Sequence, residues 1–507
     1  MVSLRRIFAN WEPRALTTRT AQTACLAVFL LFTVFPLLMS FFIGTGSASP
    51  ALIDQRQFEL LKNSLYFATG SASVALLLAT PTGILLWDKS YSRLRSFLIF
   101  LILVPPYLYA QGFMTLSASP PPGLGFLIKA SGINWSALIC GVALSPMAAL
   151  LISLAPYLLS SAPLESAKLS MDPQQILWRI VLPSTRYLFM AAGAMTFAFA
   201  LLEGGLPLSL QTIVFATEIT SKFLAGTSTA IIFVEIWPFF ILILLPVLAI
   251  WPFIKKLQSR KSLNRQADML SLKELQPLYG YAILAGTVIF LIFVSLPLLA
   301  LLRQSFTGAQ AGLSWGTDGK ALLWSMATAF SSAGICGILV AKSGNIAGGF
   351  RILPLLAILT MVIPPSLHGT AWATTGAHFS WLPSFLVMVA AHCARALPLT
   401  LLVAFLAWKS FSRQHLMESA SVANAPIGLQ LRLRAPIIAV CTGIAAVVSL
   451  RELEVSLLTV PPGGQTLPLR IFNLMHYGAG ADVARLSLVF AALLALAGNF
   501  LIRRWPK

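Results

Sequence analysis

The sequence predicts an all-α integral membrane protein with 12 transmembrane helices arranged as two tandem six-helix halves. Hydrophobic residues make up 57% of the 507 residues and charged residues only 10%, whereas soluble domains average roughly 45–50% apolar and about 25% charged residues. Two further observations support this fold class. Long apolar runs recur along the whole chain, and a polar segment of the first half returns in the second.

Twelve apolar runs are long enough to cross the roughly 30 Å hydrocarbon core of a bilayer as helices. They lie at 22–43, 62–87, 96–116, 137–160, 184–209, 229–254, 279–302, 322–341, 352–372, 384–408, 437–460 and 484–502. We therefore expect a first six-helix half at 1–254, a charged linker at 255–278 and a second six-helix half at 279–507.

The basic residues predict the orientation of the chain. The net charge is +19, but Lys and Arg lie mainly in short loops between apolar runs, so we expect membrane lipid and no nucleic acid as a partner. If the N-terminus is cytoplasmic, the loops predicted inside hold most of the basic residues. This bias predicts a multi-pass protein of the inner (cytoplasmic) membrane with both termini in the cytoplasm.

Several classes of site are not indicated by the sequence. The five cysteines lie in or beside apolar runs without CxxC or His-paired spacing, so we expect no disulfide framework and no metal site. HExxH, GxSxG and a glycine-rich phosphate loop are also missing. We therefore expect no cofactor and no enzymatic activity in this chain, and any ATP hydrolysis must belong to another polypeptide.

A polar, proline-broken segment at 165–183 recurs 253 residues later. The identical positions are Glu165/Glu418, Ser166/Ser419, Ala167/Ala420, Pro173/Pro426, Arg179/Arg432 and Pro183/Pro436. Similar offsets link Pro105-Pro106 with Pro364-Pro365, and Pro146 with Pro398. An internal duplication explains these matches. Six spans per half is an even number, so the copies should share one orientation about an axis along the membrane normal.

Each copy of this segment predicts two short helices with a break, on the cytoplasmic side. Asp172 is a suitable N-cap for a helix that begins at Pro173. Asn424 tolerates the left-handed conformation of a sharp turn. An exposed amphipathic helix on each half would offer matching surfaces to a symmetric partner.

These segments resemble the coupling motif of ABC importer permeases, in which Glu-Ala-Ala is followed by a glycine and later by a Leu-Pro pair. The glutamate and alanine lie at Glu165 and Ala167 and again at Glu418 and Ala420, and the closing prolines are Pro183 and Pro436. Ser166 and Ser419 replace an alanine, Met171 and Asn424 replace the glycine, and Ala435 replaces the last leucine. The stretch "RELEVSLLTVPPGGQTLPLRIFNLMHYG" further resembles fused two-half permeases of ferric iron and thiamine uptake.

The resemblance implies a permease subunit of a binding-protein-dependent importer. Its partners would be two ATP-binding subunits on the cytoplasmic side and an external or periplasmic substrate-binding protein. The implied ATPase-coupling residues are Glu165, Ala167, Pro173, Pro183, Glu418, Ala420, Asn424, Pro426 and Pro436. Because methionine is unfavourable in a glycine-like turn, we expect the first copy, with Met171, to couple less well than the second.

Charged residues inside the spans suggest a substrate pathway, because such residues are rare and usually functional. Glu203 lies in the fifth span, and Glu452 and Glu454 lie in the eleventh, its counterpart. Arg451 can neutralise only one of them, and an i,i+3 pair with Glu454 that merely neutralises itself is an open alternative. The remaining negative charge favours a cation, with ferric iron first and a small organic cation such as thiamine or a polyamine second.

A secondary active transporter of the 6+6 major facilitator type is the alternative function. Its loop motif between the second and third spans is not matched by "GILLWDKSYSRLR", which lacks the second glycine. Such a transporter would also have no reason to repeat a helical docking segment. A membrane enzyme is a weaker possibility, because the spans supply no His/Asp/Ser cluster.

Overall fold

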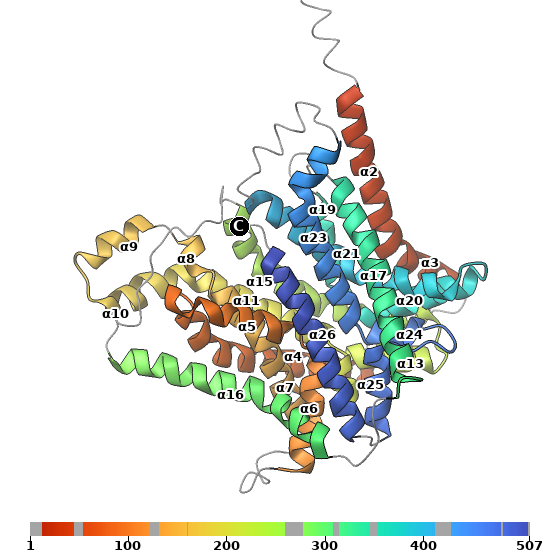
Figure 1. Cartoon of the computed structure of the whole chain (residues 1–507), viewed down its shortest axis with the longest axis horizontal. Coiled ribbons are helices and arrows are strands. Elements are labelled where there is room, and N and C mark those ends of the chain that lie inside the picture. The colour runs from red at the N-terminus through yellow and green to blue at the C-terminus, as the bar shows by residue number, and fades with distance from the viewer. Residues whose placement is uncertain are drawn as a thin grey trace, which may run out of the picture. The chain divides into compact units, whose positions relative to one another are not determined.

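The computed structural model describes residues 13–44, 54–120, 131–159, 161–258, 277–307, 314–343, 352–410, 427–477 and 480–504. All regular secondary structure in these ranges is helical, which confirms the all-α prediction (Figure 1). The chain divides into two compact units. Unit 1 comprises Met1–Ile43, Leu323–Gln465 and Phe500–Lys507, and unit 2 comprises Gly44–Leu322 and Thr466–Asn499.

The two units do not follow the sequence halves at 1–254 and 279–507. Helices α2 (Pro13–Thr33) and α3 (Phe35–Gly44) come first in the chain, yet they pack with later helices in unit 1. The indole Nε1 of Trp372 donates to the carbonyl of Phe32 at 3.1 Å. Conversely, α16 (Pro277–Thr307) and most of α26 (Gly480–Arg504) belong to unit 2. Each unit therefore closes its core with helices from both ends of the chain.

Unit 2 is built around α4 (Gln55–Leu85), which packs against α7 (Gly132–Ile152), α11 (Leu182–Leu202) and α16. Helix α16 also packs on α6 (Pro106–Ala118). A Cβ atom on Gly112 of α6 would collide with the backbone carbonyl of Pro297 in α16. Small residues of this kind permit the close helix approach on which packing in membranes depends.

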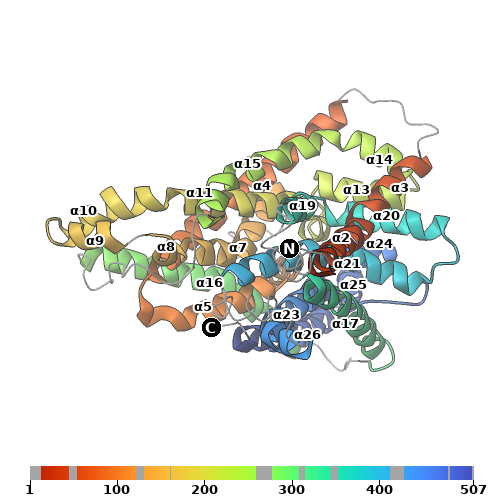
Figure 2. The same cartoon turned by 90° about the horizontal axis from the view of Figure 1, so that it is seen from above.

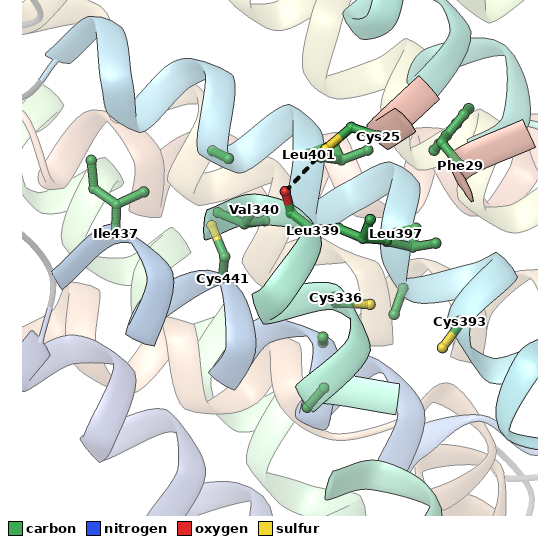
Figure 3. Close-up of a cluster of buried hydrophobic side chains, with 14 of the residues drawn as sticks. Cys25, Phe29, Cys336, Leu339, Val340, Cys393, Leu397, Leu401, Ile437 and Cys441 are labelled. Carbon is green, nitrogen blue, oxygen red and sulfur yellow. Dashed lines mark hydrogen bonds between the residues drawn. The ribbon is translucent and has the colours of Figure 1, made fainter. Parts of the chain in front are cut away.

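Unit 1 is built around α21 (Ser384–Ser410), which packs against α2, α19 (Ile352–Met361), α20 (Pro365–His378) and α23 (Ile427–Arg451). Figure 3 shows part of its core, in which four cysteines lie among apolar side chains. They are Cys25, Cys336, Cys393 and Cys441, and Cys336 comes from α17 (Asp318–Ser343). None of the four forms a disulfide bond and all four are buried, and such cysteines pack as small apolar side chains.

The described residues support a multi-pass membrane protein with fewer clear spans than predicted. Eight helices are long and apolar enough to cross a membrane, and counting three bent helix pairs as single spans raises the number to 11. The bent pairs include α14 (Thr229–Glu235) with α15 (Trp237–Gln258), at 57°. The run predicted at 352–372 is divided between α19 and α20 and is not among these candidates.

Proline pairs break two helices in the same way. Helix α5 (Ser92–Leu103) ends before Pro105-Pro106 and lies at 87° to α6, which begins at Pro106. Helix α19 ends before Pro364-Pro365, and α20 begins at Pro365. Pro105 and Pro364 both have extended backbones, with φ/ψ of −65°/147° and −55°/141°. A residue before proline is driven out of the helical region, whereas proline itself suits the first helical position.

Candidate functional site

The first copy of the repeated polar segment forms a helical hairpin at one end of unit 2 (Figures 1 and 2). It consists of α9 (Ser161–Lys168), a four-residue turn and α10 (Pro173–Ile176). Helix α10 begins at Pro173 as predicted, and Asp172 before it is extended. A turn of π-helix, η3 (Leu177–Val181), joins α10 to α11, so that Pro173–Leu202 is one 30-residue helix. The hairpin is therefore attached rigidly to a candidate span.

Burial separates an inner and an outer face of this hairpin. Glu165 is exposed, Leu169 at the turn is 90% exposed, and Trp178 is 58% exposed. Ala167 is only 6% exposed, so the chain itself covers it, and α9 contacts α10. The small alanine therefore serves packing of the hairpin, whereas the exposed side chains, Glu165 among them, are free to meet a partner. Pro173 is half-buried and Pro183 is exposed.

The turn of the hairpin does not need a glycine. Among the described residues, Gln211, with φ of 54°, is the one non-glycine residue in the left-handed region. Met171 is thus in an ordinary conformation, and its N–H donates to the carbonyl of Ala167 at 2.9 Å. The expected backbone strain at Met171 was wrong, because the turn closes through helix-like hydrogen bonds.

The second copy of the segment is mostly outside the described residues. Glu418, Ala420, Asn424 and Pro426 all lie in the range 411–426. Pro436 lies inside α23. The roles predicted for these residues therefore rest on the sequence.

Glu203 and Glu452 occupy matching positions at two helix breaks. Helix α11 ends at Leu202, one residue before Glu203, and α23 ends at Arg451, one residue before Glu452. The N–H of Glu203 donates to Ala200 at 3.2 Å, and the N–H of Glu452 donates to Ser449 at 3.3 Å. Short helices α12 (Gly205–Ser209) and α24 (Glu454–Thr459) follow. The sequence predicted unbroken spans at 184–209 and 437–460, so both breaks were missed.

The Glu203 carboxylate caps the helix that follows it. Its Oε1 accepts a hydrogen bond from the N–H of Leu206 at 3.1 Å, which satisfies one of the free N–H groups of α12. The side chain is half-buried. Glu203 therefore has a structural role in addition to any contact with a solute.

Arg395 of α21 connects two helix breaks within unit 1. Its Nη1 donates to the carbonyl of Ile363 at 3.1 Å, just before the Pro364-Pro365 break. Its Nε lies 3.7 Å from Oε2 of Glu452, and the two side chains are 16% and 11% exposed. Arg395 was not among the site residues predicted from the sequence. The only available signal was a single arginine in the apolar run 384–408.

Arg451 and Glu454 do not stand on one continuous helix. Helix α23 ends at Arg451 and α24 begins at Glu454, so the i,i+3 geometry proposed for a self-neutralising pair is interrupted. Both residues make interactions, and Glu454 is 5% exposed. With Arg395 beside Glu452, this break has two arginines, Arg395 and Arg451, and two glutamates, Glu452 and Glu454. The surplus of negative charge expected here is therefore not present in unit 1.

Two buried histidines lie in the same unit. His392 of α21 bridges the second break, because its Nδ1 is 2.9 Å from the Ser449 hydroxyl and its Nε2 is 3.2 Å from the Ser456 hydroxyl. The Ser456 hydroxyl donates to the carbonyl of Glu452, so it must accept from the imidazole, and Nε2 carries the proton. His368 of α20 is also fully buried, but neither of its ring nitrogens has a hydrogen-bond partner.

Within unit 2, ion pairs of opposite polarity attach two amphipathic helices to the first residues of α4 and of α17. Glu218 of α13 (Phe215–Leu224) accepts two hydrogen bonds from Arg56 of α4, both at 3.0 Å. Lys222 of α13 pairs with both Glu218 and Glu235. Arg470 of α25 (Leu467–His476) donates to Asp318 of α17 at 3.0 Å. The topology expected from the sequence puts all these groups on the external side.

We expect the Arg470–Asp318 pair to be needed for the seating of α25. Asp318→Arg should lower the melting temperature, because it places like charges together in a partly buried site. The double variant Asp318→Arg/Arg470→Asp should recover most of the loss, since opposite charges face each other again. Thermal unfolding of the wild type, Asp318→Arg, Arg470→Asp and the double variant in one detergent measures this coupling. A double variant as unstable as the sum of its single changes would contradict it.

The part of the chain that the structure describes contains no group of three or more His, Cys, Asp or Glu side chains that could hold a metal ion. In comparisons with protein-family models, curated protein sequences and solved structures, nothing matches this chain. Function is therefore inferred from the hairpin, the helix breaks and the charged side chains.

Proposed function

We propose that the chain is the permease subunit of an ATP-driven ABC importer of the inner membrane, with both termini in the cytoplasm. The observation that carries this proposal is the repeated polar segment, whose first copy is an exposed hairpin continuous with a candidate span. Two separate ATP-binding subunits dock on the two copies and supply the ATP hydrolysis. An external binding protein delivers the solute.

The form of the hairpin suits mechanical coupling. A force applied at Glu165 or Leu169 acts on α10, and α10 continues through η3 into α11 without a break. At its far end α11 stops at Leu202, beside Glu203. Movement of an ATP-binding subunit would therefore reach the helix break that we assign to the substrate pathway. Irregular backbone at membrane depth is tolerated where it lines a cavity or is buried in protein.

The proposed solute is a cation. The choice of ferric iron first and of a small organic cation second is based on the family resemblance and on Glu203. Arg395 compensates Glu452, so the second carboxylate no longer argues for a cation. Glu203, Arg451, Glu452 and Glu454 remain our candidates for the pathway, and Arg395 joins them.

Purification of the full-length chain from its native membrane tests the proposal. We expect ATPase activity and a separate ATP-binding subunit to co-elute with it, in a ratio of two such subunits to one chain. A pure, monodisperse chain without ATPase activity, which transports in vesicles under an ion gradient, would support the major facilitator alternative instead.

Reporter fusions after Pro173 and after Pro426 should both give a cytoplasmic signal, and an external signal from either would overturn the topology.

A further inference from the structure

The Arg395–Glu452 ion pair is looser than the Arg56–Glu218 and Arg470–Asp318 pairs. Arg56 and Glu218 make two hydrogen bonds of 3.0 Å, and Arg470 reaches Asp318 at 3.0 Å. By contrast, Nε of Arg395 has no hydrogen-bond partner and lies 3.7 Å from Glu452, although Arg395 is much less exposed than Arg56. A nearly buried ion pair without good geometry is poorly compensated for its lost hydration, so a better partner can displace it.

His368 shows the same contrast with His392. The fold gives both nitrogens of His392 a serine hydroxyl, whereas neither nitrogen of His368 makes a well-formed hydrogen bond, although the Pro364 carbonyl lies close to the ring, in a site with no exposure to solvent. Buried polar groups are nearly always hydrogen-bonded, and an exception calls for a partner from outside the protein. The chain can therefore satisfy a buried histidine, and it does not do so at His368.

The unsatisfied groups gather at the Pro364-Pro365 break. His368 is the fourth residue of α20, and Arg395 is close enough to act on it electrostatically. Ser366, the second residue of α20, is also fully buried with an unpaired hydroxyl. These side chains can donate hydrogen bonds, and the N-terminal end of a 14-residue helix adds a partial positive charge. Such a set of donors is complementary to negatively charged oxygen atoms.

We propose that Arg395 and His368 form a binding site for an oxyanion group, a carboxylate or a phosphate, of the transported solute. Glu452 is the internal counter-ion of Arg395, and binding of the oxyanion displaces its carboxylate from Arg395. This inference rests on the proposed transport function and makes it more specific. A metal ion or an organic cation that uses this pathway then carries, or is bound by, an oxyanion group.

The Glu452→Gln variant distinguishes an oxyanion site from a cation site, because the substitution should strengthen oxyanion binding and weaken cation binding. We would measure the melting temperature of the full-length chain in lipid nanodiscs with acetate, with inorganic phosphate and with chloride, at equal ionic strength and pH. Acetate or phosphate should stabilise the wild type more than chloride does. Glu452→Gln should lower the concentration needed several-fold, because the competing carboxylate is gone. A carboxylate site responds to acetate and a phosphate site to phosphate, and a response to neither would overturn the proposal.

His368→Leu and His392→Leu form a matched pair of variants. His368→Leu should unfold at the same or a higher temperature without anion, because it removes unpaired buried polar groups, and it should lose the anion response. His392→Leu should unfold at a lower temperature and keep the response. An anion response that survives in both His368→Leu and Arg395→Lys would overturn the site. Co-elution of the ATPase is measured separately. Failure of the anion tests would overturn the oxyanion site and leave the permease assignment standing. The permease assignment would be overturned only if the ATPase did not co-elute.

Discussion

Reversing the charge of both coupling glutamates, Glu165→Lys with Glu418→Lys, is expected to abolish co-purification of the ATP-binding subunits. Glu165 is exposed on α9, where a docking partner would meet it. Removing one member of a buried charge contact at an interface costs about 2–5 kcal/mol, and reversal adds repulsion. Two such losses in one complex should reduce it below detection, as measured by the ATPase that elutes with the tagged chain.

Matched variants make this result specific. Glu59→Lys is the control, because Glu59 is also an exposed glutamate on a helix but lies on α4, away from the hairpin. The control should retain the full complex. Because Met171 is unstrained, we now expect each single reversal to weaken the complex to a similar degree. An unchanged complex in the double variant would remove the glutamates from the coupling surface.

Replacing Glu203 by glutamine should reduce solute uptake by about tenfold or more, the equivalent of about 1.4 kcal/mol, while ATPase activity is retained. The amide oxygen of glutamine can still accept the hydrogen bond that Leu206 donates to Glu203, so the cap of α12 survives and only the charge is lost. Uptake and ATPase activity would be measured in the reconstituted complex with its binding protein.

The cap and the charge of Glu203 can be separated by a second substitution. Glu203→Ala removes both, so it should lower the melting temperature as well as uptake, in line with the loss of about 0.5–2 kcal/mol when a helix cap is removed. Full uptake with Glu203→Gln would leave Glu203 as a cap alone and remove it from the pathway.

Much of the local structure follows from the sequence alone. Apolar runs of about 20 residues require helices, because a backbone in lipid must satisfy its own hydrogen bonds. The hairpin of α9 and α10 follows from proline and capping preferences of neighbouring residues, as does the start of α10 at Pro173. The proline pairs indicated the internal repeat, but the helix breaks that they cause were not predicted. These features depend on contacts between residues that are close in the chain, so the sequence pattern is enough to predict them.

The tertiary structure alone decided which distant residues share a core and which charges meet. Periodicity shows that a helix is apolar but not which helix covers it, so the placing of α2 with α21 and of α16 with α4 had no signal in the sequence. The same holds for Arg395, which meets Glu452 across 57 residues of chain, and for His392, which two serines satisfy while His368 stays unpaired. Pairing of charges and hydrogen bonds depends on distances between helices, and these are fixed only when the helices pack.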